Sequence, residues 1–169
     1  MKVLVKKTQI QAKIKQLARR ISKDYLSKDL ILVGVLKGSF IFLADLARAI
    51  TVPLEVDFIQ VASYGAKATS SGVIKLKKEI DLPIEGKDVL IVEDIIDSGY
   101  TVAYLLHFIK HKKPRSLAVC ALLDKPARRK VRVKIAYKGF TVPDRFMIGY
   151  GLDHDEACRN LPYIGYLGK

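Results

Sequence analysis

The chain has 169 residues, of which half are hydrophobic and 28% are charged. That length fits one domain, and the composition excludes an intrinsically disordered chain. Lysine and arginine outnumber aspartate and glutamate by 30 to 17, and the net charge of +13 favours a polyanionic partner such as nucleic acid, an acidic membrane surface or a multiply phosphorylated small molecule. The two cysteines lack a C-x-x-C motif and metal-ligand spacing, which excludes a disulfide scaffold and a zinc site.

The basic residues are scattered along the chain without interleaved aromatic residues, so a solvated basic surface is the alternative to a polyanion site. No apolar stretch approaches the roughly 20 residues of a membrane-spanning helix, and residues 1–7 are too short for the apolar region of a signal peptide. We therefore expect a cytoplasmic protein without a membrane partner.

Hydrophobic periodicity predicts the elements in chain order. Ile10, Ile14, Leu17 and Ile21 recur at helical spacing and predict an amphipathic helix over residues 8–25. Apolar runs and alternation predict strands at residues 30–36, 54–61, 73–78, 87–92, 116–123 and 131–137, and further helices at 40–50 and 101–110. Because strands alternate with helices, we expect a single α/β domain with a mainly parallel, doubly wound sheet and helices on both faces.

The loop after the strand at 87–92 is the most informative, since ligands of such sheets bind beyond the carboxyl ends of the strands. From Glu93 to Thr101 the sequence reads EDIIDSGYT and leads directly into a helix. The first N–H groups of the helix and the hydroxyls of Ser98 and Thr101 can converge on one anion, which predicts a phosphate site. An ordinary strand-turn-helix with a capping Ser or Thr is the alternative for DSG alone.

Glu93 and Asp94 extend this interpretation. Ionised carboxylates only accept hydrogen bonds and supply hard oxygen ligands, so beside a phosphate they indicate sugar hydroxyls or Mg²⁺. A ribose 5-phosphate is the simplest ligand that satisfies both features. The sequence contains neither G-x-x-x-x-G-K-[ST] nor a G-x-G-x-x-G after a strand, which argues against a P-loop hydrolase and a dinucleotide-binding protein.

The segment VLIVEDIIDSGYT resembles the phosphoribosyl-pyrophosphate motif of type I phosphoribosyltransferases, and its wording is similar to the hypoxanthine-guanine branch of purine salvage. Similar segments occur in the same order at residues 36–39, at 63–65, at Lys125 and at 142–153 with Glu156 and Arg159. The resemblance covers roughly residues 4–167. It implies the type I fold, with a small hood subdomain built from about residues 1–8 and 138–169 and a mobile active-site loop at about 63–75.

The resemblance also implies an activity. This is transfer of the phosphoribosyl group from 5-phospho-α-D-ribose 1-diphosphate to N9 of a 6-oxopurine, hypoxanthine and/or guanine, which gives IMP or GMP and pyrophosphate with Mg²⁺ as cofactor. Asp97 is the implied catalytic residue, near N7 of the purine, where it can accept a proton. The leaving pyrophosphate is held in that family by a loop with a cis peptide, similar here to Leu36-Lys37-Gly38.

The implied site residues form five groups. Around the phosphoribosyl diphosphate and its 5-phosphate lie Glu93, Asp94, Asp97, Ser98, Gly99, Tyr100 and Thr101. The pyrophosphate is assigned to Lys37, Gly38 and Arg159, the mobile loop to Ser63 and Tyr64, the purine to Lys125, Phe146, Met147 and Asp153, and the metal to Glu93, Asp94 and Asp153. Without the resemblance, Lys37 and Lys125 are ordinary solvated lysines and Phe146 is a core residue.

Two positions depart from the usual sequence pattern of the family: Tyr100 stands at a variable position of the phosphate loop, and Arg145 stands where lysine is usual. The family implies a homodimer or homotetramer. An RNA-binding regulator built on this fold is the alternative function, motivated by the charge of +13 and disfavoured by the complete set of catalytic residues. The preference among hypoxanthine, guanine and xanthine stays open at this point.

Overall fold

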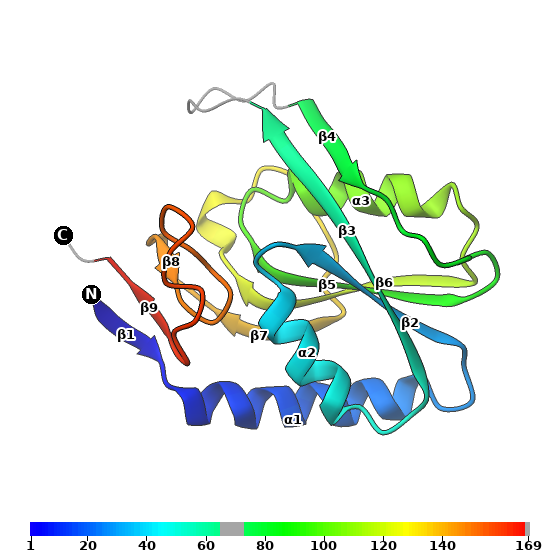
Figure 1. The fold of residues 1–169 in the computed structure, drawn as a ribbon, viewed down its shortest axis with the longest axis horizontal. Coiled ribbons are helices and arrows are strands. Elements are labelled where there is room, and N and C mark those ends of the chain that lie inside the picture. The colour runs from blue at the N-terminus through cyan, green and yellow to red at the C-terminus, as the bar shows by residue number, and fades with distance from the viewer. Residues whose placement is uncertain (65–72, 168–169) are drawn as a thin grey trace.

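The computed structural model describes residues 1–64 and 73–167, which form two sheets flanked by helices (Figure 1). The large sheet has the strand order β4-β3-β2-β5-β6-β7. Its strands are β2 (Leu30–Leu36), β3 (Leu54–Tyr64), β4 (Val73–Lys78), β5 (Asp88–Ile96), β6 (Ser116–Asp124) and β7 (Tyr137–Thr141). The helices are α1 (Lys7–Asp24), α2 (Phe40–Ala49), α3 (Tyr100–Lys110) and the short 3₁₀ helix η1 (Pro126–Arg128).

The large sheet is parallel except for its edge strand β4, which runs antiparallel to β3. After β2 the chain passes through α2 to β3, and after β5 it passes through α3 to β6 on the other side. The neighbours β2 and β5 therefore send their connections in opposite directions, and a crevice forms beyond their carboxyl ends. The predicted mainly parallel α/β fold is confirmed, and this switch point is where a ligand site is expected.

Strand residues alternate between two hydrophobic cores. Leu32 and Leu90 belong to the core that α1 and α2 cover, whereas Val33 and Ile91 belong to the core that α3 covers. Because successive side chains of a strand point to opposite faces, an uninterrupted apolar run is needed when both faces are buried. Figure 1 shows α1 and α2 on the side of the sheet opposite α3, as predicted.

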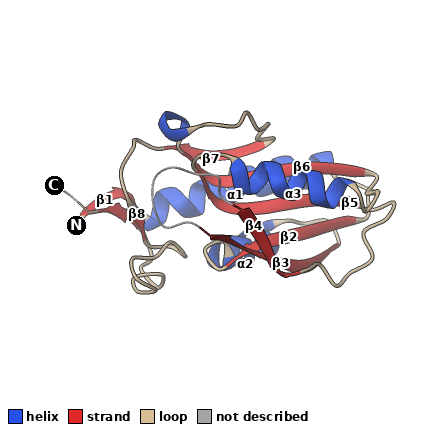
Figure 2. Cartoon of the chain, turned by 90° about the horizontal axis from the view of Figure 1, so that it is seen from above, coloured by secondary structure: helices blue, strands red, loops and turns tan. Residues whose placement is uncertain are grey.

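A second, small sheet joins the two ends of the chain. Its strands are β1 (Lys2–Val5), β9 (Ile164–Tyr166) and β8 (Met147–Ile148), in the order β1-β9-β8. All of its pairings are antiparallel, and Figure 2 shows this sheet at one end of the molecule. The predicted hood draws on the same segments, and its covering role stays a prediction.

The structure differs from the sequence expectations at two strand boundaries. The strand expected at residues 131–137 is wrong for its first part, because β7 begins only at Tyr137, where pairing with Cys120 of β6 starts. Val133 and Ile135 alternate because they pack against the core under α3. The strand expected to end at residue 92 continues to Ile96, since β5 goes on pairing with β6 after its pairing with β2 has ended at Val92. Residues 65–72 of the predicted mobile loop lie outside the described residues.

No helix in the described ranges is long and apolar enough to cross a bilayer.

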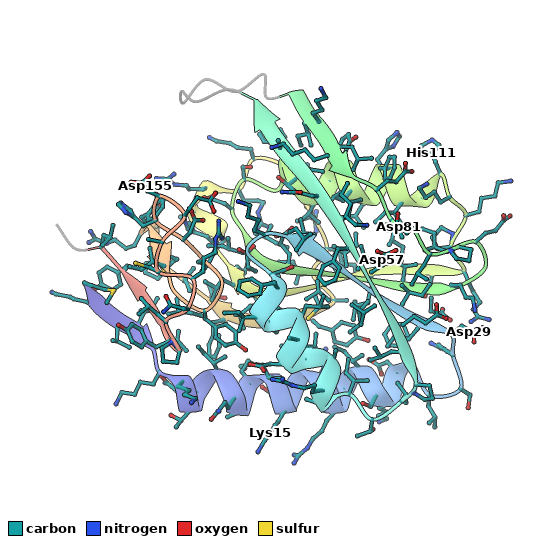
Figure 3. The ribbon with its side chains drawn as sticks, viewed as in Figure 1. Lys15, Asp29, Asp57, Asp81, His111 and Asp155 are labelled. Atoms are coloured by element: carbon teal, nitrogen blue, oxygen red, sulfur yellow. The ribbon has the colours of Figure 1, made fainter. Side chains whose placement is uncertain are left out.

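Asp57 on β3 forms hydrogen bonds with the backbone of the segment that follows β4. The buried carboxylate accepts hydrogen bonds from the backbone N–H groups of Phe58, Asp81 and Leu82 at 2.6–2.8 Å. Figure 3 shows Asp57 and Asp81 close together in this region. Burial alone raises the pKa of Asp57, but these hydrogen bonds and the nearby Lys78 ammonium outweigh it and hold the pKa below its ordinary value.

We predict that Asp57→Ala lowers the free energy of unfolding by about 2–3 kcal/mol at pH 7, because backbone N–H groups lose their acceptor inside the protein. The folded-state pKa is depressed, so this stabilisation is present above about pH 4 and is lost as the pH falls through the folded-state value. Urea unfolding at pH 7 and at pH 3 measures both effects. The control Asp29→Ala removes an exposed carboxylate and should change the free energy by less than about 0.5 kcal/mol. Equal losses for the two variants would contradict the assignment.

Candidate active site

A cleft of about 760 Å³ opens at the carboxyl ends of β5 and β6, next to the small sheet. Its volume lies within the range of small-molecule sites. It brings together all four predicted purine-binding residues and two of the predicted phosphoribosyl-binding acids. The lining residues are Asp94, Ile95, Asp97, Lys125, Arg128, Asp144, Arg145, Phe146, Met147, Leu152, Asp153 and Leu167.

A second, smaller cavity of about 100 Å³ lies at the start of α3. Glu93, Asp97, Ser98, Gly99 and Thr101 of the predicted phosphate loop are among its lining residues. The N-terminus of α3 carries partial positive charge and free N–H groups, so this cavity suits an anion. Asp97 lines both cavities and therefore stands where the two meet. Tyr100, the variable member of the loop, is 43% exposed.

Glu93 and Asp94 bury two adjacent carboxyl groups at the end of β5, with exposures of 6% and 8%. Asp94 accepts a hydrogen bond from the N–H of Ile95 at 2.8 Å, whereas Oε2 of Glu93 has no partner among the described residues. Burial, followed by the charge of Asp94, raises the pKa of Glu93 well above its usual value. Burial also raises the pKa of Asp94.

The loop after β2 packs between Asp94 and the small-sheet segment. A Cβ atom at Gly38 would collide with Oδ2 of Asp94, and a Cβ atom at Gly151 would collide with the carbonyl oxygen of Gly38. Because neither contact leaves room for a Cβ atom, only glycine fits at positions 38 and 151. The peptide between Leu36 and Lys37 is cis, as the resemblance implied for this loop.

Four charged groups connect this loop with the segment between β8 and β9. The Lys37 ammonium and the Arg159 guanidinium both lie 3.1 Å from the same carboxylate oxygen of Glu156. Arg159 also contacts Asp153 at 3.0 Å and donates to the carbonyl of Gly151 at 2.8 Å. The two predicted pyrophosphate-binding cations are thus held together by one exposed carboxylate.

Lys125 follows β6 and is buried, with its ammonium 3.3 Å from Oδ2 of Asp97. Oδ1 of Asp97 is buried and has no hydrogen-bond partner in the described ranges. Phe146 lines the cleft and is 57% exposed. The centroids of its ring and the His154 ring lie 5.7 Å apart, and the two ring planes meet at 90°. The cleft thereby offers a flat apolar face, a buried cation and a carboxylate with free lone pairs.

Residues 4–155 match the family described as "Phosphoribosyl transferase domain". The chain belongs to the phosphoribosyltransferase family. It is 50% identical to the hypoxanthine-guanine phosphoribosyltransferase of Mycobacterium avium over 98% of this chain and 84% of that protein, and 47% identical to the one of Bacillus subtilis over 98% and 92%. The solved hypoxanthine-guanine phosphoribosyltransferase of Bacillus anthracis is 45% identical, with a TM-score of 0.95 over 99% of both chains. The family and the transferase class that the sequence indicated are confirmed.

Of the metal residues predicted for this phosphoribosyltransferase, Asp94 and Asp153 line the same cleft, and Glu93 precedes Asp94 in the chain. In the described residues no three His, Cys, Asp or Glu side chains form a group that could hold a metal ion, and Asp153 is engaged by Arg159. Mg²⁺ is commonly bound through one or two carboxylates plus phosphate oxygens of the substrate. The hard oxygens of Glu93 and Asp94, with Oε2 of Glu93 unpartnered, fit a cation that arrives with the substrate.

Some residues of the site were not found from the sequence. Arg128 and Asp144 form an ion pair at 2.6 Å beside the cleft, and Arg129 contacts the back of the phosphate loop. Both arginines lie in a run of basic residues in which no spacing marks one member from another. Of the predicted mobile-loop residues, Ser63 and Tyr64 end β3, and the segment beyond them is outside the described ranges.

We predict that Glu93→Gln raises the melting temperature of the substrate-free protein at pH 8. The folded-state pKa of Glu93 is raised, so protonated Glu93 contributes fully to the free energy of unfolding at low pH. This contribution is lost as the pH rises through the folded-state pKa. The variant lacks this loss, and each 1 kcal/mol gained corresponds to about 2–4 °C for a chain of this size. Differential scanning calorimetry at pH 5 and pH 8 measures the change, which should be larger at pH 8.

Asp88→Asn is the matched control, because Asp88 is an equally buried acid at the other end of β5 that Arg115 and Ser116 fully engage. Its replacement should lower the melting temperature. A loss of stability in both variants would contradict the view that Glu93 is an unfavourable buried acid.

Proposed function

We propose that this chain transfers the phosphoribosyl group of 5-phospho-α-D-ribose 1-diphosphate to N9 of a 6-oxopurine, giving IMP or GMP and pyrophosphate in a Mg²⁺-dependent reaction. The observation that carries the proposal is the position of Asp97, which lines both the anion-sized cavity at α3 and the large cleft with the buried Lys125. A sugar phosphate that bridges the two cavities would place its anomeric carbon beside Asp97. The relatives are named hypoxanthine-guanine phosphoribosyltransferases, and these names support the same substrate class.

Binding of the sugar phosphate is the first step. The N–H groups of the loop and the hydroxyls of Ser98 and Thr101 would hold the 5-phosphate at the positive end of α3. The carboxylates of Glu93 and Asp94 would accept hydrogen bonds from the ribose hydroxyls. Their desolvated position makes these hydrogen bonds stronger than they are in water.

The purine would enter the large cleft and stack on the exposed ring of Phe146. The Lys125 ammonium would donate to the 6-oxo oxygen, and the backbone of Met147 and the Asp153 region would face the remaining edge. A cation at this place favours a 6-oxopurine over adenine, whose 6-amino group is itself a donor.

Proton transfer falls to Asp97. Its Oδ2 is paired with Lys125, while Oδ1 retains lone pairs that can accept the N7 proton as the new glycosidic bond forms. Lys37 and Arg159 would hold the leaving pyrophosphate through charge-assisted hydrogen bonds. A bound Mg²⁺ would supply neutralisation of the pyrophosphate charge.

The direct test is pyrophosphate release with phosphoribosyl diphosphate and Mg²⁺, with hypoxanthine, guanine, xanthine and adenine offered separately. We expect release with a 6-oxopurine and a fall in kcat of about 10²–10⁴-fold in Asp97→Asn, with the KM for phosphoribosyl diphosphate little changed. Asp155→Asn, at a fully exposed position, is the control and should keep the activity. Removal of Mg²⁺ with a chelator should stop the reaction.

If folded protein in excess Mg²⁺ released no pyrophosphate with any of the four bases, the proposed reaction would be refuted. Salt-dependent retention of RNA by the same sample would then favour the RNA-binding alternative. A cytoplasmic location and a dimeric or tetrameric assembly stay predictions.

Glu156 generates a second test, because it holds both cations that would bind the leaving group. The diphosphate must compete with this carboxylate for Lys37 and Arg159. We predict that Glu156→Gln lowers the KM for phosphoribosyl diphosphate and the inhibition constant of pyrophosphate by about 2–10-fold, the range expected for exposed ion pairs. Initial-rate kinetics with pyrophosphate as product inhibitor measure both constants.

Asp155→Asn removes the same charge one residue away without contacting either cation, so both constants should stay within about twofold of wild type. Equal changes in the two variants would assign the effect to the general field of the loop, and weaker binding in Glu156→Gln would refute the competition.

A further inference from the structure

The connection between β6 and β7 holds the phosphate loop from behind. The Arg129 guanidinium donates through Nε to the carbonyl of Asp97 at 3.0 Å and through Nη2 to the carbonyl of Ile96 at 3.1 Å. The N–H groups of Lys130 and Val131 both donate to the carbonyl of Ser98, at 2.8 and 3.0 Å. Three consecutive carbonyl groups of the loop therefore face residues 129–131.

This contact fixes the direction of the loop's donors. In a trans peptide the C=O and N–H groups point in opposite directions. Carbonyls of residues 96–98 that face the connection therefore turn the N–H groups of residues 97–99 away from it. Successive N–H groups on one side of a turn form an anion-binding concavity, and the cavity of about 100 Å³ is lined by Asp97, Ser98 and Gly99.

The arginine side chain is itself held in place. Its Nη2 lies 2.5 Å from Oδ1 of Asp124 at the end of β6, and the other oxygen of Asp124 lies 3.3 Å from the Lys138 ammonium. The side chains of Arg129 and Asp124 are only 19% and 10% exposed. An ion pair with little solvent access orders its partners more firmly than an exposed pair.

The two segments also fit closely. Gly99 has a φ of 91°, and a Cβ atom there would lie 2.5 Å from the carbonyl oxygen of Val131 and 3.1 Å from Cδ of Arg129. The loop thus packs on Arg129 without an intervening side chain. Lysine could not replace the arginine, because one ammonium does not offer the planar pair of donors that reaches two carbonyls and a carboxylate together.

We infer that Arg129 is a positioning residue of the phosphate site: it does not touch the substrate, and it aims the N–H groups of Asp97 and Ser98 at the 5-phosphate by holding the carbonyls of Ile96 and Asp97. The inference rests on the proposed phosphoribosyl transfer for its ligand, a ribose 5-phosphate group. It assigns a function to one member of a basic run that otherwise resembles a solvated surface. The remaining charge of that run, including the exposed Arg132, is not needed for it.

The test measures ligand binding apart from catalysis. Arg129→Lys keeps the positive charge and loses the planar fork, and Arg132→Lys makes the same change at an exposed neighbouring position. Calorimetric titration with ribose 5-phosphate should give a Kd about tenfold or more higher in Arg129→Lys and unchanged in Arg132→Lys. In steady-state kinetics the KM for phosphoribosyl diphosphate should rise by a similar factor, while the KM for the purine stays within about twofold.

A purely structural role would lower the melting temperature of Arg129→Lys and leave the Kd of the folded fraction at the wild-type value, which would overturn the inference. If Arg129→Lys does not fold, Asp124→Asn loosens the same guanidinium and should raise the Kd in the same direction by a smaller factor; an unchanged Kd there would also overturn it. Wild-type protein that binds ribose 5-phosphate but releases no pyrophosphate would refute the proposed reaction alone. Wild-type protein that binds neither ribose 5-phosphate nor phosphoribosyl diphosphate would refute both.

Discussion

Two carboxyl groups buried side by side at the end of β5 are the constraint around which the site is organised. Moving a carboxylate out of water is expensive unless donors or cations replace the lost hydration. Here the compensation is incomplete, since the pKa values of both groups are raised and one oxygen of Glu93 is unpartnered among the described residues. Such a pair is stabilised further when a ligand brings hydroxyl donors or a cation.

The loops around this pair arrive from distant parts of the chain, and each is fixed by contacts made to its backbone. Gly38 touches Asp94 on one side and Gly151 on the other, which connects the loop after β2 with the small-sheet segment. Arg129 and its neighbours hold the carbonyls of the loop after β5. Contacts of this kind leave little freedom for the backbone, so donors are oriented before the ligand binds, and less ordering entropy opposes binding.

The sequence predicts the elements that burial determines. The run at residues 30–36 is apolar throughout because both faces of β2 are covered, and α1 shows helical spacing because only one of its faces is buried. The predicted strand boundaries were wrong where pairing between distant segments determines which residues form a strand. Val131, Val133 and Ile135 alternate like a strand, yet the backbone there crosses behind the phosphate loop and donates to Ser98. Similarly, β5 extends beyond residue 92 because β6 continues beside it, which no local pattern encodes.

The site residues likewise fall into those that a local sequence motif reveals and those that only the folded chain reveals. Asp97, Ser98 and Thr101 stand in one short motif with a mechanism of its own, so they were found from the sequence. Arg129 was not found, because its role depends on which carbonyls happen to face it in the folded chain. In a basic run such as residues 128–134, only three-dimensional structure separates a guanidinium bound to backbone carbonyls from exposed neighbours such as Lys130 and Arg132.

The two ends of β5 show how the buried acid proposed for the site differs from a structural one, without reference to relatives. Asp88 at the start of the strand and Glu93 near its end are both buried. Asp88 receives donors from Arg115 and Ser116, which hold its pKa below the ordinary value despite burial. A buried acid with a structural role is thus supplied with donors by the fold itself. Oε2 of Glu93 lacks such a donor, and the same holds for Oδ1 of Asp97 within the described residues, so the oxygens that the fold leaves unpaired belong to residues that line the two cavities.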